Sequence, residues 1–302
     1  MKLLGDAGCI VESELVKIPE SLVEENLKKV RSEFKLYSRG GKRKYKIGGD
    51  NVIYNPGSSA IYFSDINIGG MRRAQTKDFR DLVRLTDGLE HIHAQSTAVV
   101  PSDVPENISD FYRLYLILKN SSKPIITGAF TLEGLTHMKS LLEAVIGEPD
   151  ELREKPRAIF DCCPSSPLMW SHVTCQNLLD CAKYGIPAEI IPAPQMGATS
   201  PVSIAGTLVE ANAEFLSGLV ISQVACSGAP IVYGGSPSVF DMRYLTARLG
   251  AVESVRTACA GAQMGKHYRV PTHGYLGLSD SKTPDGQGSF ESGMGILLAA
   301  LS

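Results

Sequence analysis

The chain has 302 residues, enough to bury a large core, and its 30 Lys and Arg residues nearly balance its 32 Asp and Glu residues. The formal net charge is only −2 and the signs are interspersed, so no basic field is present to attract nucleic acid or an anionic membrane. No apolar run approaches the length of a membrane span and no secretory leader follows Met1, so we expect a cytoplasmic protein. The seven cysteines are an odd number without C-x-x-C spacing, which favours reduced thiols.

The first 90 residues predict an N-terminal segment of short elements. The stretch V-K-I-P-E-S-L-V-E-E-N-L-K-K (16–29) has helical spacing, and G-G-D-N-V-I-Y-N-P-G-S-S-A-I-Y-F (48–63) is typical of a glycine-rich hairpin. A lead-in helix is predicted over residues 76–89, with Thr76 and Asp78 as its capping residues. We expect residues 1–90 to pack on residues 91–302 as parts of one structural domain.

From residue 91 onward, apolar segments alternate with amphipathic ones. Strands are predicted over residues 91–100, 124–130, 157–163, 187–194, 229–235 and 268–274. Between them, apolar residues recur at spacings of three and four, as in 109–120, 132–146 and 175–184, which predicts helices. This alternation implies a parallel sheet with right-handed crossovers.

The parallel sheet belongs either to an open doubly wound fold or to a closed barrel. No G-x-G-x-x-G motif follows any predicted strand, and the strand ends carry polar and aromatic residues, so a TIM (β/α)8 barrel is favoured. A barrel needs eight strands, and at roughly 30 residues per unit two units would be missing. We therefore expect an α/β barrel truncated at its C-terminus to about six βα units, with an N-terminal helix and a glycine-rich hairpin. The open edges of such a sheet favour a homo-oligomer.

Metal binding is not predicted by the histidines and cysteines. His91 and His93 lie two residues apart, and Cys162 and Cys163 are adjacent. Neither spacing matches a structural zinc motif, so we expect no metal.

Lys282 is a second chemical candidate, because a lysine at a strand end suits a Schiff-base lyase. An imine-forming lysine needs a desolvated pocket that lowers its pKa. Lys282 lies in the polar turn S-D-S-K-T-P-D, where solvation or an ion pair with Asp280 is the commoner outcome. The lyase stays an alternative function.

Aromatic residues are concentrated in the predicted loops and strand ends. Several converging rings form a low-dielectric box that attracts a quaternary ammonium ion, although any single ring is more often a packing residue. The rings are Tyr54, Tyr62, Phe130, Trp170, Tyr233, Phe240, Tyr244 and Tyr275.

Two motifs near the C-terminus make the sequence resemble a known family. With the hairpin sequence and P-I-I-T-G-A-F-T-L-E-G, the motifs Y-G-G-S-P-S-V-F-D-M-R (233–243) and S-D-S-K-T-P-D-G-Q (279–287) resemble the trimethylamine:corrinoid methyltransferase family. The resemblance implies a TIM barrel that moves a methyl group from a methylated amine to the Co(I) of a corrinoid carried on a separate small protein. The chain itself lacks the D-x-H-x-x-G motif of cobalamin-binding proteins, so we expect a corrinoid partner.

The choice of amine follows from what the sequence lacks. Family members that act on trimethylamine carry pyrrolysine, whereas this chain has only standard residues. It is similar instead to the non-pyrrolysine branch, whose substrates are quaternary amines such as glycine betaine or proline betaine. The alternative within this family is an incomplete, inactive fragment that only binds the corrinoid protein.

Position and residue type then predict the site. His273 is expected to be the catalytic residue and, together with Asn55, to bind a substrate carboxylate. An aromatic box would hold the cation of the substrate. The pairs Asp241 with Arg243 and Asp280 with Lys282 are expected to brace two loops. The complete set of predicted substrate-binding residues is Tyr54, Asn55, Tyr62, Phe130, Gln195, Tyr233, Gly234, Ser236, Phe240 and Tyr275.

Overall fold

The computed structural model describes residues 1–147 and 151–302, and the chain divides into two compact units. Unit 1 consists of Met1–Glu33, Cys162–Lys183 and Ala188–Ser302, and unit 2 of Phe34–Asp161 and Tyr184–Pro187. This division does not follow the expected boundary at residue 90. Residues 34–90 cluster with the predicted strands that come directly after them.

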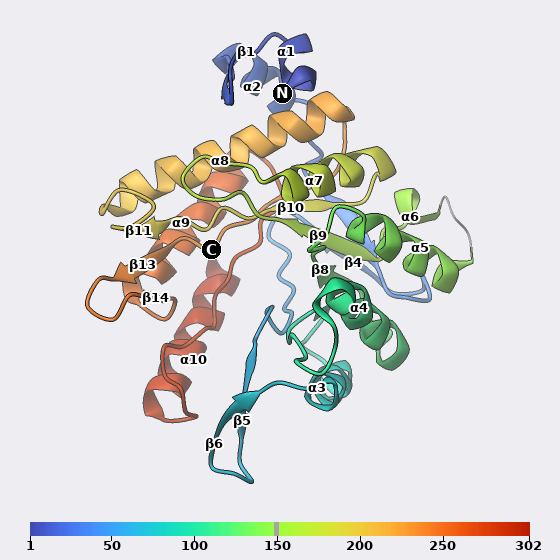
Figure 1. Cartoon of the computed structure of the whole chain (residues 1–302), viewed down its shortest axis with the longest axis vertical. Helices are drawn as coiled ribbons and strands as arrows, with labels where there is room; N and C mark the ends of the chain where they lie inside the picture. The colour runs from blue at the N-terminus through green and yellow to red at the C-terminus, as the bar shows by residue number, and fades with distance from the viewer. Residues whose placement is uncertain (148–150) are drawn as a thin grey trace. The chain divides into compact units, whose positions relative to one another are not determined.

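Unit 2 contains two antiparallel ribbons followed by parallel βα units (Figure 1). Its elements are β3 (Phe34–Tyr37), β4 (Lys44–Ile47), β5 (Tyr62–Asp65), β6 (Gly70–Arg73), α3 (Thr76–Gly88), β7 (Gln95–Ser96), the 3-10 helix η1 (Glu106–Ile108), α4 (Ser109–Asn120), β8 (Ile125–Thr127), α5 (Gly134–Ile146), α6 (Glu151–Glu154) and β9 (Ala158–Cys162, the last residue in unit 1). Strand β8 pairs in parallel with β7 on one side and β9 on the other. The first three predicted strands and the helices over 109–120 and 132–146 are thereby confirmed.

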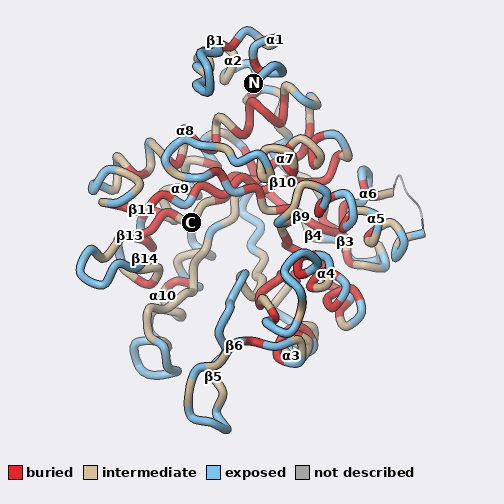
Figure 2. The backbone as a smooth tube through the Cα atoms, in the orientation of Figure 1, coloured by how far each residue is buried: buried red, intermediate tan, exposed pale blue. Residues whose placement is uncertain are grey.

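The helices of unit 2 bury one face each because their apolar residues share a stripe. In α5, Leu135, Met138 and Leu142 are buried at spacings of three and four. Each such side chain contributes about 1.5–3 kcal/mol when fully removed from water. Strands β8 and β9 are also mostly buried, whereas most residues of the β5–β6 ribbon are exposed (Figure 2).

The predicted hairpin over 48–63 is wrong. Strand pairing begins only at its end, where Tyr62 of β5 pairs with Arg73 of β6. Positive φ angles at Gly48, Gly49 and Gly57 interrupt any extended strand before that point.

The capping prediction for α3 is half right. Asp78 accepts a hydrogen bond from the backbone N–H of Gln75 at 2.9 Å, so it closes a capping box as expected. The N-cap residue is Gln75, because Thr76 already has helical backbone geometry.

Unit 1 contains the later βα units and both chain termini (Figure 1). Its elements are α1 (Lys2–Asp6), β1 (Ile10–Glu12), β2 (Leu15–Lys17), α2 (Glu20–Leu27), α7 (His172–Tyr184, the last residue in unit 2), β10 (Ala188–Ile190), β11 (Gln195–Met196), α8 (Ile204–Ala225), β12 (Ile231–Tyr233), β13 (Ser238–Asp241), β14 (Thr246–Arg248), α9 (Val252–His267) and α10 (Gly286–Leu301). Strands β10 and β12 pair in parallel, which confirms the fourth and fifth predicted strands.

The sixth predicted strand is reduced to one parallel bridge between Tyr233 and Thr272. Pro271 has no N–H to donate, and Arg269 has a φ of 56°. The residues before Thr272 therefore cannot extend the hydrogen-bonded pairing with β12. The backbone N–H of His273 still donates to the carbonyl of Tyr233 at 3.0 Å. Residue 273 is therefore fixed beside the end of β12.

The start of the predicted N-terminal helix is wrong, and the last helix of unit 1 has a clear N-cap. The N-terminal helix does not include residues 16 and 17, which pair with β1, and α2 begins after Pro19. Helix α10 begins at Gly286, because the Asp285 carboxylate accepts a hydrogen bond from the Gly288 N–H at 2.8 Å.

Helix α8 has 22 residues and is long and apolar enough to span a membrane by composition alone. It contacts α2 and α9 within unit 1, and Phe215 and Leu219 are buried. These contacts are those of a core helix, so its composition is weak evidence for a membrane span.

Candidate functional site

The structure brings a carboxylate and an imidazole together in unit 1. Glu189 lies in the middle of β10 and is fully buried, and its Oε2 is 2.5 Å from Nδ1 of His273. The two residues are 84 positions apart in sequence. They meet because β12 pairs with β10 through Val232 and with the segment before His273 through Tyr233.

Gly234 is required beside this pair. A Cβ atom at this position would lie 2.5 Å from Oε1 of Glu189 and 2.8 Å from the carbonyl oxygen of Ile190. Such distances are well inside van der Waals contact, so only glycine fits without a backbone shift. The Y-G-G motif thus has a local steric reason.

The second carboxylate oxygen of Glu189, Oε1, has no hydrogen-bond partner in the part of the chain that the structure describes. A buried carboxylate with one oxygen on an imidazole fixes the orientation of that ring. The ring of Tyr275 lies 5.4 Å from the His273 ring, at an interplanar angle of 41°. Glu189, Gly234, His273 and Tyr275 therefore form one corner, which we call the Glu189–His273 corner.

Tyr233 belongs to the core of unit 1. Only 5% of this residue is exposed, its ring lies 4.2 Å from the ring of Phe215, and its hydroxyl donates to Oδ1 of Asn212 at 3.3 Å. Burial also raises the pKa of the Tyr233 phenol. The expected place of this ring in an aromatic box is corrected, because the ring packs against α8.

Three further predicted residues of unit 1 lie in turns and a ribbon. The carbonyl of Gln195 accepts backbone N–H groups of the tight turn that follows it, and the N–H of Ser236 donates to Pro192. Phe240 pairs with Ala247 in the β13–β14 ribbon.

The two predicted bracing pairs are wrong. The Asp241 carboxylate pairs with the guanidinium of Arg248 at 2.8 Å, whereas Arg243 contributes only its backbone N–H. The Asp280 carboxylate accepts the N–H of Leu249 at 3.0 Å. Side-chain pairing follows the ribbon register of β13 with β14, which sequence neighbours do not reveal.

Lys282 is exposed, and no ion pair with Asp280 is found in the described residues. A Schiff-base lysine requires a desolvated pocket, whereas Lys282 lies at an exposed position. The structure therefore disfavours the lyase alternative.

Tyr54 and Asn55 lie in unit 2. The backbone N–H of Tyr54 donates to Nδ1 of His93 at 3.1 Å, and the two rings are stacked at 6.4 Å. Burial is the largest cause of the lowered pKa of His93. Asn55 accepts the N–H of Gly57 in a local turn. Tyr54 is thus held against His93, and Asn55 takes part in a turn with Gly57.

Phe130 and Tyr62, also in unit 2, each have an arginine over one face. The guanidinium carbon of Arg113 lies 4.6 Å from the Phe130 ring centre, and that of Arg73 lies 5.3 Å from the Tyr62 ring centre. A cation on one face of a ring lowers the attraction of the other face for a second cation. Both rings are therefore less suited to hold an ammonium ion than their exposure suggests.

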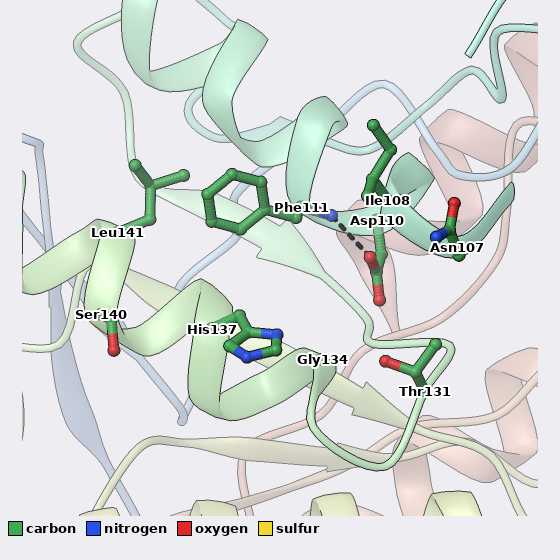
Figure 3. Close-up of a pocket in the computed structure, with 9 residues that line it drawn as sticks. All are labelled: Asn107, Ile108, Asp110, Phe111, Thr131, Gly134, His137, Ser140 and Leu141. Carbon is green, nitrogen blue, oxygen red and sulfur yellow. Dashed lines mark hydrogen bonds between the residues drawn. The ribbon is translucent and has the colours of Figure 1, made fainter. Parts of the chain in front are cut away.

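A groove of about 390 Å³ lies between α4 and α5 of unit 2 (Figure 3). Its lining residues are Asn107, Ile108, Asp110, Phe111, Thr131, Gly134, His137, Ser140 and Leu141. The carboxylate of Asp110 already accepts the backbone N–H groups of Phe111 and Phe130, at 2.7 and 2.9 Å. None of the predicted site residues lines this groove.

Glu189 was missed by the sequence prediction. The available signal was a single carboxylate inside the apolar segment P-A-E-I-I-P, because a charge in a buried strand needs a partner. Within the described part of the chain, no three His, Cys, Asp or Glu side chains form a group able to hold a metal ion.

The class of protein follows from these features: an α/β fold of parallel βα units, in which the buried carboxylate of Glu189 on β10 pairs with the partly exposed imidazole of His273 in unit 1. The fold matches that of the Methanosarcina barkeri monomethylamine methyltransferase, with a TM-score of 0.60. The match covers 88% of this chain and 56% of that chain, at 11% sequence identity. This neighbour belongs to a TIM-barrel family.

The sequence profile of the family described as trimethylamine methyltransferase (MTTB) matches residues 1–302, so the chain belongs to this family. The chain is 30% identical to a trimethylamine methyltransferase and to a glycine betaine methyltransferase, both of Desulfitobacterium hafniense. These alignments cover 100% and 98% of this chain, and 61% and 62% of the relatives. It is 31% identical to the trimethylamine methyltransferase of Methanosarcina barkeri, over 100% of this chain and 62% of that protein. The chain thus spans about three fifths of the length of these relatives.

Proposed function

We propose that this chain belongs to a corrinoid-dependent methyltransferase and binds a quaternary amine such as a betaine. The family and the names of the relatives support methyl transfer from a methylated amine. One of the relatives is a glycine betaine methyltransferase, which supports a betaine as the substrate. The observation that carries the proposal is the Glu189–His273 corner, a buried anionic group beside an aromatic ring.

A quaternary ammonium group needs no acid or base to leave. The C–N bond breaks with its electron pair passing to nitrogen, so a cationic amine departs as a neutral tertiary amine. The Co(I) centre of the acceptor supplies the electron pair that forms the new bond to the methyl carbon. The work left for the chain is to orient the cation and to remove water from it.

The Glu189–His273 corner is suited to the cationic end of the substrate. Glu189 holds the imidazole through Nδ1, and its charge favours a positive group in a region of low dielectric constant. The Tyr275 ring adds a π face to the same corner. The earlier assignment of a substrate carboxylate to His273 is less favourable, because Glu189 would repel it.

The acceptor would be a corrinoid on a separate protein, as the family resemblance implies. We further propose that the parallel βα units belong to a (β/α)8 barrel, in line with the solved methylamine methyltransferase. Cytoplasmic location and homo-oligomer formation stay predictions.

The corner is tested by Glu189→Gln, which keeps the shape of the side chain and removes its charge. We expect the affinity for glycine betaine, measured by isothermal titration calorimetry, to fall on the order of tenfold, because a neutral amide attracts a cation less. The matched control is Lys282→Gln, a charge change at an exposed position, and it should leave binding unchanged. Unchanged affinity in a folded Glu189→Gln variant would contradict the proposed role.

A further inference from the structure

Arg113 is a fully buried cation whose hydrogen bonds are incomplete. It lies on α4 of unit 2, and its Nη1 donates to the carbonyl of Thr97 at 3.0 Å. Its Nε and Nη2 have no hydrogen-bond partner in the part of the chain that the structure describes. Buried donors without partners are rare in native proteins and require an explanation.

The two donors without partners share one edge of the guanidinium plane. Nε–H and one N–H of Nη2 point in parallel, and this fork matches the two oxygens of a carboxylate. Arginine is chosen over lysine wherever planar, two-point recognition of a carboxylate is needed. The edge is therefore complementary to a carboxylate that none of the described residues supplies.

The nearby acidic side chains do not satisfy this edge. Asp110 and Asp161 interact with the Arg113 charge electrostatically, but neither bonds Nε or Nη2. The Asp110 carboxylate is engaged with the backbone N–H groups of Phe111 and Phe130. Burial outweighs both acidic neighbours and lowers the pKa of Arg113 to about 10, so the guanidinium is still protonated at neutral pH.

Arg113 lies where a substrate group is expected in a fold of parallel βα units. Its backbone acceptor, Thr97, directly follows β7, and α4 belongs to the connection from β7 to β8. The buried hydroxyl of Thr127, at the end of β8, also has no hydrogen-bond partner among the described residues. Binding groups in such folds gather at the carboxyl ends of the strands.

Phe130 covers the guanidinium. Its ring centre lies 4.6 Å from the Arg113 guanidinium carbon, yet 51% of Phe130 is exposed. Its backbone is held by Asp110, whereas the side chain faces solvent on one side. Access to the cation from this side therefore requires the Phe130 side chain to rotate away.

We infer that Arg113 and Phe130 form a carboxylate-binding site in unit 2, in which the Nε–Nη2 edge binds the ligand carboxylate and Phe130 covers it. The ligand class rests on the proposed function, because betaines carry a carboxylate and simple methylamines do not. Arg113 is then the residue that selects zwitterionic amines.

The test measures binding of three probes by isothermal titration calorimetry. Glycine betaine carries both charges, 3,3-dimethylbutyrate is its shape analogue with the carboxylate alone, and choline has the ammonium group alone. Arg113→Lys keeps the charge and removes the fork, so affinity for glycine betaine and dimethylbutyrate should fall on the order of tenfold to a hundredfold. Choline affinity should stay the same, and the control Arg84→Lys, at an exposed position of α3, should leave all three unchanged.

A second measurement needs no variant, in case Arg113→Lys fails to fold. Dimethylbutyrate should protect Arg113 of the unaltered chain from phenylglyoxal, as read by peptide mass spectrometry, and choline should not. Equal labelling with and without dimethylbutyrate overturns the inference.

The outcomes separate this inference from the proposed function. Binding of glycine betaine and choline with equal affinity, unaffected by Arg113→Lys, overturns the carboxylate site and leaves methyl transfer standing. Carboxylate binding that depends on Arg113, in a protein that transfers no methyl group, supports the site and contradicts the proposed function.

Discussion

Gly234 and Glu189 constrain each other at the scale of single residues. Gly234→Ala places a Cβ 2.5 Å from the Glu189 carboxylate and 2.8 Å from a backbone carbonyl oxygen. Relief of this clash requires the backbone to shift, which costs free energy. We expect a loss of about 1–3 kcal/mol in the free energy of unfolding, measured by urea denaturation. Gly261→Ala in α9 is the matched control, since its nearest outside atom is 3.9 Å away, and it should stabilise by about 0.5–1 kcal/mol. Equal effects of the two changes would refute the steric account.

Tyr233 provides a second test at this scale. Tyr233→Phe removes one hydroxyl that bonds Asn212 inside the core, so stability should fall by about 0.5–1.5 kcal/mol. Affinity for glycine betaine should not change, because the ring packs on α8. A selective loss of amine binding without a change in stability would restore the ring to the aromatic box.

Site residues could be predicted where a short sequence motif showed why the residue type is needed. His273, Gly234 and Tyr275 were expected at the site because a histidine, a glycine pair and a tyrosine at strand ends are visible in the sequence, and their roles there stay predictions. Glu189 and Arg113 were missed, because their importance comes from complete burial and from partners far along the chain. Neither property can be read from spacing.

At the scale of elements, Asp78 joins β6 to the start of α3. Its two oxygens accept from Nη1 and Nη2 of Arg72 at 2.7 and 2.8 Å, and one of them also accepts the Gln75 N–H. The Arg72 guanidinium is the largest cause that lowers the pKa of Asp78 below its ordinary value of 3.8. The ionised carboxylate therefore stabilises the fold above pH 3.8, and this contribution is lost as pH falls through the lower folded-state pKa.

The change Asp78→Asn should thus destabilise the protein most at neutral pH, by about 1–3 kcal/mol, and progressively less below pH 3.8. Chemical denaturation of both proteins between pH 7 and pH 3 measures this difference. Asp81→Asn, at an exposed position of the same helix, is the control. A destabilisation that does not depend on pH would show that the charge of Asp78 contributes nothing.

Regular helices and buried strands were the most predictable elements. The helix over 109–120 was located to the residue, and five of the six predicted strands contain a strand of the structure. The hairpin failed because its pairing depends on turn geometry at glycines, and the sixth strand failed because Pro271 removes a donor. Positive-φ glycines and prolines change the backbone locally but do not alter the spacing of apolar residues. A prediction from that spacing therefore misses them.

At the scale of the whole molecule, the sequence predicted the class of fold but not its division into units. Parallel βα units and membership of the trimethylamine methyltransferase family agree with the prediction. The grouping of residues 34–90 with the first strands depends on long-range contacts, which have no sequence period. The chain also spans about three fifths of the length of its relatives, so its activity is a matter for direct measurement.

Methyl transfer from a quaternary amine to a corrinoid is the reaction proposed for this chain. The most direct measurement mixes the protein with a corrinoid protein reduced to Co(I) and with glycine betaine, proline betaine, choline or trimethylamine, and follows the Co(I) absorbance. We predict that a betaine alone among these amines consumes Co(I), with release of the corresponding tertiary amine. Unchanged Co(I) absorbance with every betaine, or consumption with trimethylamine alone, would contradict the account.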